Sequence, residues 1–339
     1  MCILLLLRVA DNHIEPPPPG SRTPSHPIQD YVDQFLITVW SCQCDVANKG
    51  VPVPEPVKRE DISAKLARKE TFQQSRYSCE TVILDDDYHV DVIKENFTRK
   101  LPAMLPDLID EVSVAARDQI AASENDWTST EVLPAMRTIV ARASNRAFVG
   151  LPLCRNQTYL TLMVDFSVNV MKGAVILRLC PRLLKPLVAL FVKPLFVNSD
   201  TYRAEAYLRP IIEGRQKAMA ELGEGWNDKP NDLLQFLLDK AATRNETMFI
   251  IAQRLLAMNF AAIHTSSMTV THALFHLAED PALVAALREE VETAIAADGW
   301  TAVALGNMWQ LDSLLRETVR YYGISLCKHP FPLPPPPPA

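Results

Sequence analysis

The sequence contains little glycine, only ten residues in 339, and few runs of alternating β-branched residues. Both features argue against a sheet-rich fold, because strands favour β-branched residues and the turns between them favour glycine. From about residue 61 to residue 322, apolar residues instead recur at helical spacing. We therefore expect a mainly α-helical fold, with helices at about 61–73, 88–99, 105–123, 130–147, 156–177, 182–192, 200–222, 231–241, 246–278, 281–297 and 308–322.

The chain also lacks an excess of positive charge and a dense set of cysteines. Its formal net charge is -6, its isoelectric point is about 5.7, and its lysines and arginines are scattered. These values exclude an extended basic surface for nucleic acid. The seven cysteines are an odd number spread over a long chain, unlike the framework of small secreted disulfide proteins. We expect reduced thiols and no nucleic-acid partner.

No segment is a convincing membrane anchor. The opening MCILLLLRVA is apolar only as far as Arg8, well short of the roughly 20 residues that span a bilayer. Residues 255–278 (LLAMNFAAIHTSSMTVTHALFHLA) have the length of a span, but nine of their side chains form hydrogen bonds. Such groups are costly to bury in lipid. We interpret this segment as the buried central helix of a large domain, with a membrane span as the alternative.

Proline is concentrated at the two ends of the chain. Nine of the 26 prolines lie in the first 60 residues and seven in the last ten. Proline-rich stretches are extended and solvated, and they are also typical ligands of proline-recognising modules. We expect a poorly ordered, proline-rich segment at 1–60, a helical domain at 61–326 and a polyproline tail at 327–339.

Two helix starts have recognisable capping chemistry. Asp280 precedes Pro281, which matches an N-cap followed by proline at the first helical position. Thr130 precedes Glu131, and its hydroxyl is available to cap a second helix. We predict that helices begin at both places.

Three histidines recur in the central helix at intervals of four or eight residues. His264, His272 and His276 lie, with Met268, along one stripe of the helix. A metal site would pair His272 with His276, but the spacing places no third ligand nearby and the HExxH pattern is absent. We expect core histidines with hydrogen-bond partners, and no metal.

Several segments occur in the order typical of a known family. NFAAIHTSS in the central helix is followed by LAEDPALVAALREEVETAI and then by MWQLDSLLRETVR, while YHVDVIKENFTRKL and SNRAFVGLPLCR lie upstream. Together they resemble the cytochromes P450, the haem-thiolate monooxygenases, and particularly their fungal microsomal members. The resemblance covers roughly residues 60–326. An ExxR motif alone is weak, so the order of the segments carries the comparison.

The resemblance implies roles for the central helix. Ala261 and Ala262 stand where the helix lies against the porphyrin and leaves room for dioxygen, although close helix packing also favours alanine. Thr265 would hold water and oxygen and help to deliver protons; the alternative is a hydroxyl bonded to the preceding turn. His264 stands where the family usually has an acid, and imidazole can also relay protons.

The resemblance also implies structural and cofactor-binding residues. Glu317 and Arg320 match the family's ExxR pair, which is not catalytic and forms a buried ionic cluster with a later loop. As an isolated exposed pair they would contribute little. Arg99 in FTRKL would contact a haem propionate, with an exposed surface arginine as the alternative.

The family's thiolate loop, FxxGxxxCxG, does not occur in the 339 residues. Cys327 is followed by Lys-His-Pro-Phe, without the phenylalanine and glycines of that loop. The fold expected is thus a P450-like helical domain lacking its C-terminal haem-binding part. A cysteine thiolate bound to iron is needed for the family's oxygen chemistry. We therefore expect the chain to be inactive alone.

Full-length members insert one oxygen atom from O2 into a lipophilic small molecule. The cofactors implied are haem and NADPH, the latter through a reductase partner. Endoplasmic reticulum membrane is the implied location, although without an anchor the cytoplasm is the alternative. The stretch KGAVILRLCPRLLKPLVALFVKPLF could rest on a membrane surface or pack in the core. A haem-free helical binding module is the alternative function.

Overall fold

The computed structural model describes residues 83, 86–120, 128–181 and 183–322. Within those ranges every regular element is a helix, as the sequence predicts. The expected segments 1–60 and 327–339, and the helix expected at 61–73, lie outside the described residues. The elements are α5 (Tyr88–Asp91), η1 (Val92–Phe97), α6 (Thr98–Gln119), α7 (Val132–Phe148), η2 (Leu153–Arg155), α8 (Gln157–Leu179), α9 (Lys185–Val192), η3 (Lys193–Asn198), α10 (Ser199–Leu222), η4 (Gly223–Gly225), α11 (Leu233–Ala241), α12 (Met248–Glu279), α13 (Pro281–Asp298), α14 (Ala302–Gly306) and α15 (Trp309–Tyr321).

Most predicted helices are confirmed within a few residues, but the expected break between 99 and 105 is wrong. Elements α5, η1 and α6 follow one another without interruption, although Pro102 and Pro106 lie inside α6. A proline removes one backbone donor and stresses the preceding turn. The buried stripe of α6, which includes Met104, Leu108 and Val112, keeps the helix packed despite that loss. The short helix α14 was not predicted.

The two predicted caps have different outcomes. Asp280 caps α13 as expected, since its carboxylate accepts a hydrogen bond of 3.0 Å from the Leu283 amide. The cap at Thr130 is wrong. Helix α7 begins at Val132, and the N-cap residue Glu131 makes no side-chain cap bond. Val132 and Pro134 lie in the first turn of α7. Pro134 has no backbone N–H, so one fewer amide there needs a capping partner.

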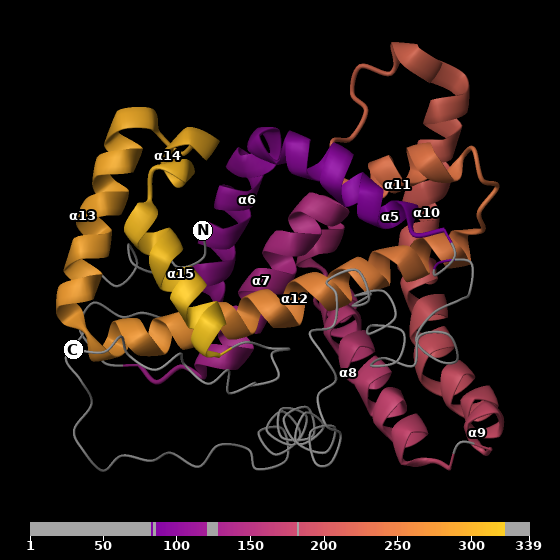
Figure 1. The fold of residues 1–339 in the computed structure, drawn as a ribbon. Coiled ribbons are helices and arrows are strands. Elements are labelled where there is room, and N and C mark those ends of the chain that lie inside the picture. Colours follow the sequence, from indigo (N-terminus) through magenta and orange to yellow (C-terminus); the bar gives the residue numbers. More distant parts are fainter. Residues whose placement is uncertain (1–82, 84–85, 121–127, 182, 323–339) are drawn as a thin grey trace, which may run out of the picture.

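Helix α12 is the central element of the structure (Figure 1). It crosses the molecule and contacts α7, α8, α10, α13 and α15. Its contact with α7 extends into its second half, where Val270 and Leu274 pack against the cluster that includes Met136. Helices α8, α9 and α10 lie at one end, and α13, α14 and α15 lie at the other. The predicted central place of this helix is confirmed, whereas its predicted burial holds for residues 251–256 and not for Ala261, Thr265 and Ser266, which are exposed.

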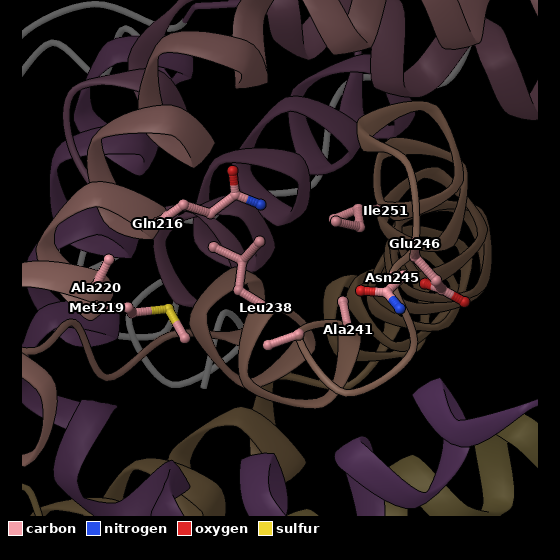
Figure 2. Close-up of a pocket in the computed structure, with 9 residues that line it drawn as sticks. Gln216, Met219, Ala220, Leu238, Ala241, Asn245, Glu246 and Ile251 are labelled. Carbon is pink, nitrogen blue, oxygen red and sulfur yellow. The ribbon is translucent and has the colours of Figure 1, made fainter.

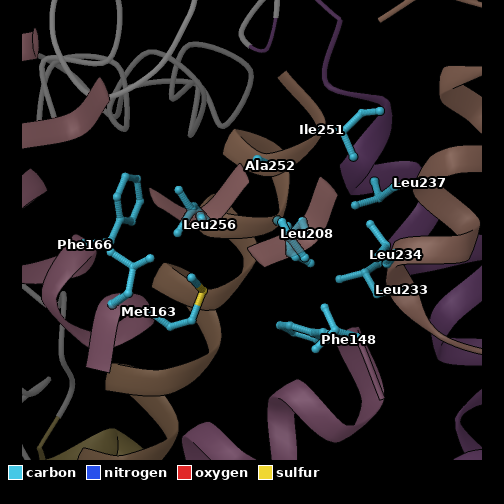
Figure 3. Packing of buried hydrophobic residues seen from close by; sticks show 14 of the residues in the cluster. Phe148, Met163, Phe166, Leu208, Leu233, Leu234, Leu237, Ile251, Ala252 and Leu256 are labelled. Carbon is cyan, nitrogen blue, oxygen red and sulfur yellow. The ribbon is translucent and has the colours of Figure 1, made fainter. Parts of the chain in front are cut away.

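The main hydrophobic core surrounds the beginning of α12 (Figure 3). Leu255 and Leu256 are fully buried there, against side chains that include Met163 of α8 and Leu208 of α10. All six residues from 251 to 256 are buried, so neighbours enclose the helix on every side at this level. A smaller core joins the end of α12 to α13, α14 and α15.

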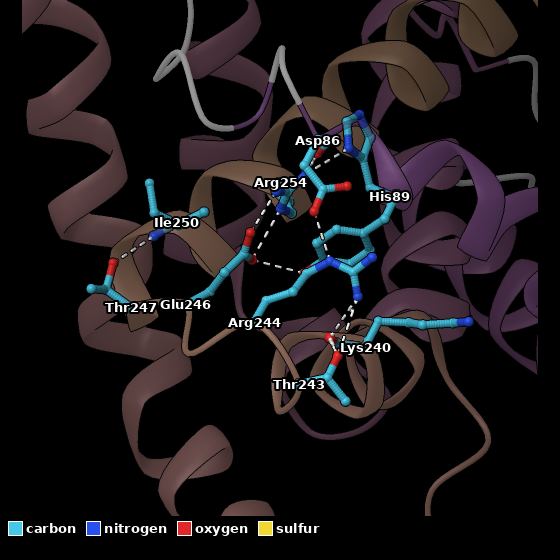
Figure 4. A network of polar contacts seen from close by, with 10 residues as sticks. Asp86, His89, Lys240, Thr243, Arg244, Glu246, Thr247, Ile250 and Arg254 are labelled. Carbon is cyan, nitrogen blue, oxygen red and sulfur yellow. Dashed lines mark hydrogen bonds and ion pairs between the residues drawn. The ribbon is translucent and has the colours of Figure 1, made fainter.

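One of those six residues is an arginine. The side chain of Arg254 is fully buried and forms an ion pair of 2.5 Å with Glu246, which precedes the helix (Figure 4). Its guanidinium also donates to the Asp86 carbonyl at 2.7 Å and lies 4.1 Å from the ring centre of Tyr88. The Tyr88 hydroxyl donates to the second Glu246 oxygen at 2.8 Å. This network fastens the start of α12 to the segment that leads into α5.

A second buried network joins α6, α7 and η2. Glu111 is fully buried and accepts hydrogen bonds of 2.7 Å from both Arg142 and Arg155. Arg142 also pairs with Asp118 at 2.6 Å. Because two cations neutralise the buried carboxylate, α6 and α7 are held in a fixed register beside α12.

Replacing Arg254 with Met should lower the free energy of unfolding by about 3–5 kcal/mol, because Glu246 is left buried without its counter-ion. Chemical denaturation of the purified chain measures this change. Arg244→Met is the matched control, since the side chains of Arg244 and its partner Asp86 are partly exposed, at 34% and 46%, and the pair should contribute about 1 kcal/mol or less. Equal losses in the two variants would contradict the assigned role of Arg254.

Candidate haem face on helix α12

The middle of α12 differs from its beginning because one face of the helix is bare. Ala261 and Thr265 are exposed there, one turn apart, and Ser266 beside them is also exposed. Ile263 on the opposite face is fully buried in the main core. Small side chains thus cover an open face in the middle of an otherwise enclosed helix. Helix packing, the alternative weighed for both alanines, does not apply to exposed Ala261 but does apply to half-buried Ala262, which packs against the main core.

The hydroxyl of Thr265 is bonded to its own helix. It donates to the Ala261 carbonyl at 2.7 Å, which is the alternative expected from the sequence. A hydroxyl that donates in this way still has two acceptor lone pairs. Because Thr265 is exposed, those lone pairs can accept a hydrogen bond from water or from a bound molecule.

The neighbouring residues Ala262 and His264 are half-buried, on the edges of the bare face.

A buried pair of asparagines fixes helix α12 just before the bare face. Asn145 of α7 donates to the Asn259 side chain at 2.8 Å, and Asn259 donates to the Leu255 carbonyl at 3.1 Å. Sequence reasoning missed this pair, although a lone asparagine in an apolar helix is a sign of a buried partner.

The ExxR residues lie on the exposed side of α15. Glu317 and Arg320 pair with each other within the helix, through Arg320 Nε at 2.8 Å and through one terminal nitrogen, and both are mostly exposed. The guanidinium holds the pKa of Glu317 below its ordinary value. The buried cluster that the resemblance implies is not formed among the described residues. The pair is present as the exposed alternative.

Arg99 lies in the first turn of α6 and is exposed. The structure therefore places it on the surface, which was the alternative expected from the sequence. Its assignment to a haem propionate stays a prediction.

The cysteines in the described part of the chain do not supply a thiolate for the haem face opposite the bare turn. Cys154 is fully buried in η2, and burial raises the pKa of its thiol to about 11, so the thiol stays protonated. Cys180 lies at the end of α8. The described residues contain no group of three or more His, Cys, Asp or Glu that could hold a metal. They fit one face of a haem and provide no thiolate for the other.

The two later histidines of α12 pack against the end of α15 and do not lie in the core. His272 is stacked on Tyr322, with ring centres 4.1 Å apart and planes 2° from parallel. His276 lies 5.4 Å from the same tyrosine ring. Burial, and then the charge of His276, lower the pKa of His272. Core histidines were expected here, so the half-buried stack corrects that prediction.

Exposed apolar side chains form a continuous surface from the end of α8 through α9 to η3. Their exposed fractions run from 38% to 92%. The members of this surface, which we call the apolar tip, are Ile176, Leu179, Leu183, Leu184, Leu187, Leu190, Phe191 and Leu195. Core packing, one of the two interpretations of this stretch, therefore does not apply to these side chains.

Two described helices are long and apolar enough to cross a membrane by length and composition alone. These are Gln157–Leu177, which belongs to α8, and Met248–Glu279, which is α12. The apolar windows of both are about half buried within the protein, at 50% and 44%. Helix α12 also contains the buried ion pair of Arg254. These features are typical of core helices.

Comparison with known proteins agrees with this architecture. A family model described as Cytochrome P450 matches residues 57–330. A cytochrome P450 monooxygenase of Ganoderma lucidum is 48% identical over 294 residues, which cover 86% of this chain and 57% of the relative. A second cytochrome P450 monooxygenase, from Postia placenta, is 36% identical over 296 residues, which cover 87% of this chain and 58% of the relative. An ent-kaurene oxidase of Gibberella fujikuroi is 31% identical over 74% of this chain and 49% of its own length.

A helical domain built round a long central helix, with a bare small-residue turn and a later ExxR helix, defines the class of protein. The chain belongs to the cytochrome P450 family, of fungal type. It spans about half the length of the curated relatives that it matches.

Native stability should fall as the pH drops below about 6.5. The unfolded chain takes up a proton near the ordinary histidine pKa, whereas folded His272 resists protonation, so acid favours unfolding. The variant His272→Phe keeps an aromatic ring stacked on Tyr322 but cannot take up a proton. The loss of stability in acid that His272 causes should therefore disappear. Urea midpoints measured from about pH 7.5 to 5.5 test this.

His276→Phe is the matched control for that experiment. This variant removes the charge of His276, the smaller of the two causes that lower the pKa of His272, and it keeps His272 buried. Most of the pH dependence of stability should therefore persist. Identical pH profiles for wild type and His272→Phe would show that the stack does not depend on a neutral imidazole.

Proposed function

We propose that this chain supplies the helical part of a P450 monooxygenase, which inserts one oxygen atom from O2 into a lipophilic small molecule. Electrons come from NADPH through a reductase partner. The single observation that supports this most directly is the bare turn of α12 with Ala261 and Thr265 on it. It coincides with the place where the resemblance puts the haem.

The residues of this turn have complementary tasks in the proposal. Ala261 and Ala262 leave a shallow surface on which a flat macrocycle can lie. Thr265 keeps its donor on the Ala261 carbonyl and uses its free lone pairs to orient a water molecule. His264, at the edge of the face, carries an imidazole, a group that can relay protons. Haem, when bound, supplies the oxygen chemistry itself.

The thiolate must come from outside these 339 residues. The sequence contains no FxxGxxxCxG loop, and burial keeps Cys154 a neutral thiol. We therefore propose that the 339 residues alone do not activate oxygen. Glu317 and Arg320, exposed here, are available to the loop that joins them in complete members of the family.

A chimera tests the proposal. The residues after Tyr321 are replaced by the corresponding C-terminal part of the Ganoderma lucidum relative, and the protein is expressed with added haem. The reduced chimera should show the carbon monoxide band of thiolate-ligated haem, which the 339 residues alone should not show. Changing the loop cysteine to serine should abolish the band. In the chimera, Thr265→Ala should divert about tenfold more reducing equivalents to peroxide, because water is no longer oriented.

Two results would contradict the proposal. A folded chimera that binds no haem would mean that the α12 face is not a haem surface. A thiolate-type band from the 339 residues alone would mean that they contain the iron ligand.

We also propose that the apolar tip rests on a membrane surface, which in relatives of this type is the endoplasmic reticulum. Eight apolar side chains on adjoining elements are each at least 38% exposed, and a concentration of exposed apolar groups is typical of an interaction surface. Lys172 and Lys185 lie on the same elements and can contact anionic headgroups. This contact is peripheral, because the helices concerned continue into the packed domain.

Leu190→Ser combined with Phe191→Ser should reduce binding to liposomes containing anionic lipid by about tenfold or more, since two side chains no longer enter the apolar layer. Co-sedimentation measures the bound fraction. The control is Val303→Ser with Trp309→Ser, which removes two exposed apolar groups near the other end of the molecule and should leave binding unchanged. Equal losses in both variants would rule out a specific role of the tip.

A further inference from the structure

A surface pocket of about 550 Å³ lies between α10, α11 and the start of α12 (Figure 2). One wall comes from α10, with Gln216 and Met219, and the floor includes Leu238 of α11 and Ile251 of α12. Its volume lies within the range of small-molecule sites. No step of the proposed oxygen chemistry uses it.

Polar contacts hold the walls of this pocket in place. Arg215, next to Gln216 on α10, forms two hydrogen bonds of 2.6 Å with Asp232, which also caps α11. The Gln235 amide of α11 lies 3.4 Å from the Met219 sulfur. Helices α10 and α11 are thus fixed to each other. A pocket with fixed walls loses little conformational entropy when a ligand binds.

The third wall is the loop before α12, and it carries the polar end of the pocket. Glu246 is almost fully buried, and its carboxylate accepts two hydrogen bonds from Arg254 and one from Tyr88. These partners occupy the Glu246 carboxylate on the side away from the cavity, so Asn245 supplies the polar group at this end of the pocket. Figure 2 shows Asn245 beside Glu246, with its amide at the same end of the pocket.

The charges select a neutral ligand. Arg254 neutralises Glu246, so neither a ligand ammonium nor a ligand anion would find an unpaired counter-charge here, and burying either charge would be costly. An alcohol suits this end of the pocket, because its hydroxyl donates one hydrogen bond and accepts another. It can donate to the Asn245 amide oxygen or accept from the Asn245 amide nitrogen, while its apolar body lies against Leu238, Ala241 and Ile251.

The pocket is separate from the candidate haem face. Ile251 and Ala261 are ten residues apart on α12, which corresponds to about 15 Å along the helix axis. A molecule in the pocket therefore does not occupy the bare turn that carries Thr265.

We propose that this pocket is a second ligand site, which takes a small neutral alcohol with a compact ring body. Binding requires only the described helices and no haem. The proposal therefore stands or falls independently of the proposed monooxygenase function.

The test is a fluorescence titration of the full 339-residue chain, without haem, with 2-naphthol and with naphthalene. 2-Naphthol should bind saturably at one site, and naphthalene should bind at least about fivefold more weakly because it forms no hydrogen bonds. Ala220→Trp combined with Ala242→Trp fills the pocket from its exposed rim and should weaken 2-naphthol binding by about tenfold or more. Ala206→Trp, exposed on α10 outside the pocket, is the matched control and should bind normally.

Asn245→Gly provides a second variant that does not depend on filling the pocket. Asn245 has a φ of 50°, which glycine adopts without strain, so the variant should fold. Its affinity for 2-naphthol should fall about fivefold while that for naphthalene stays constant. Non-saturable 2-naphthol binding, or equal effects of Asn245→Gly on both probes, would overturn the proposal. So would normal 2-naphthol binding in the filled variant.

Discussion

A guanidinium buried in an apolar core must be paired, and this constraint on Arg254 organises the structure. Its partners are Glu246, eight residues earlier, and the Asp86 carbonyl and Tyr88 ring, more than 160 residues earlier in the sequence. The arginine therefore fixes the start of α12, the loop before it and the segment that leads into α5. Both the bare turn further along α12 and the pocket beside Glu246 depend on that fixed starting point.

The character of α12 changes along its length. Residues 251–256 are enclosed on all sides, whereas Ala261 and Thr265 are exposed one or two turns later. An asparagine pair at Asn145 and Asn259 separates the two regions. A helix that is packed at both ends and bare in the middle presents a defined surface to a flat partner. The chain belongs to the cytochrome P450 family, and in our proposal that partner is the haem.

Local sequence patterns predicted the helices well, because the apolar face of each recurs at the helical period. The Asp280 cap was also predictable, since aspartate before proline favours one structure. The break predicted between residues 99 and 105 was wrong, because tertiary packing keeps α6 helical through Pro102 and Pro106. The Thr130 cap failed for a similar reason, since a side chain that can cap need not do so.

The candidate site was predictable only in part. The bare turn follows from small residues at 261 and 262, but exposure depends on which neighbours are present. The partners of Arg254 and Asn259 lie far away in sequence, and periodicity carries no information about such pairs. The pocket depends on three separate elements and on the left-handed backbone of Asn245. No single segment encodes it.

Hydrogen exchange along α12 tests most directly whether the bare turn is a haem surface. The measurement compares the haem-loaded chimera with the 339-residue chain, peptide by peptide. The account predicts that amides from about 258 to 270 exchange more slowly in the chimera, while those from about 249 to 257 are equally slow in both. Unchanged exchange at the bare turn, or equal slowing along the whole helix, would contradict it.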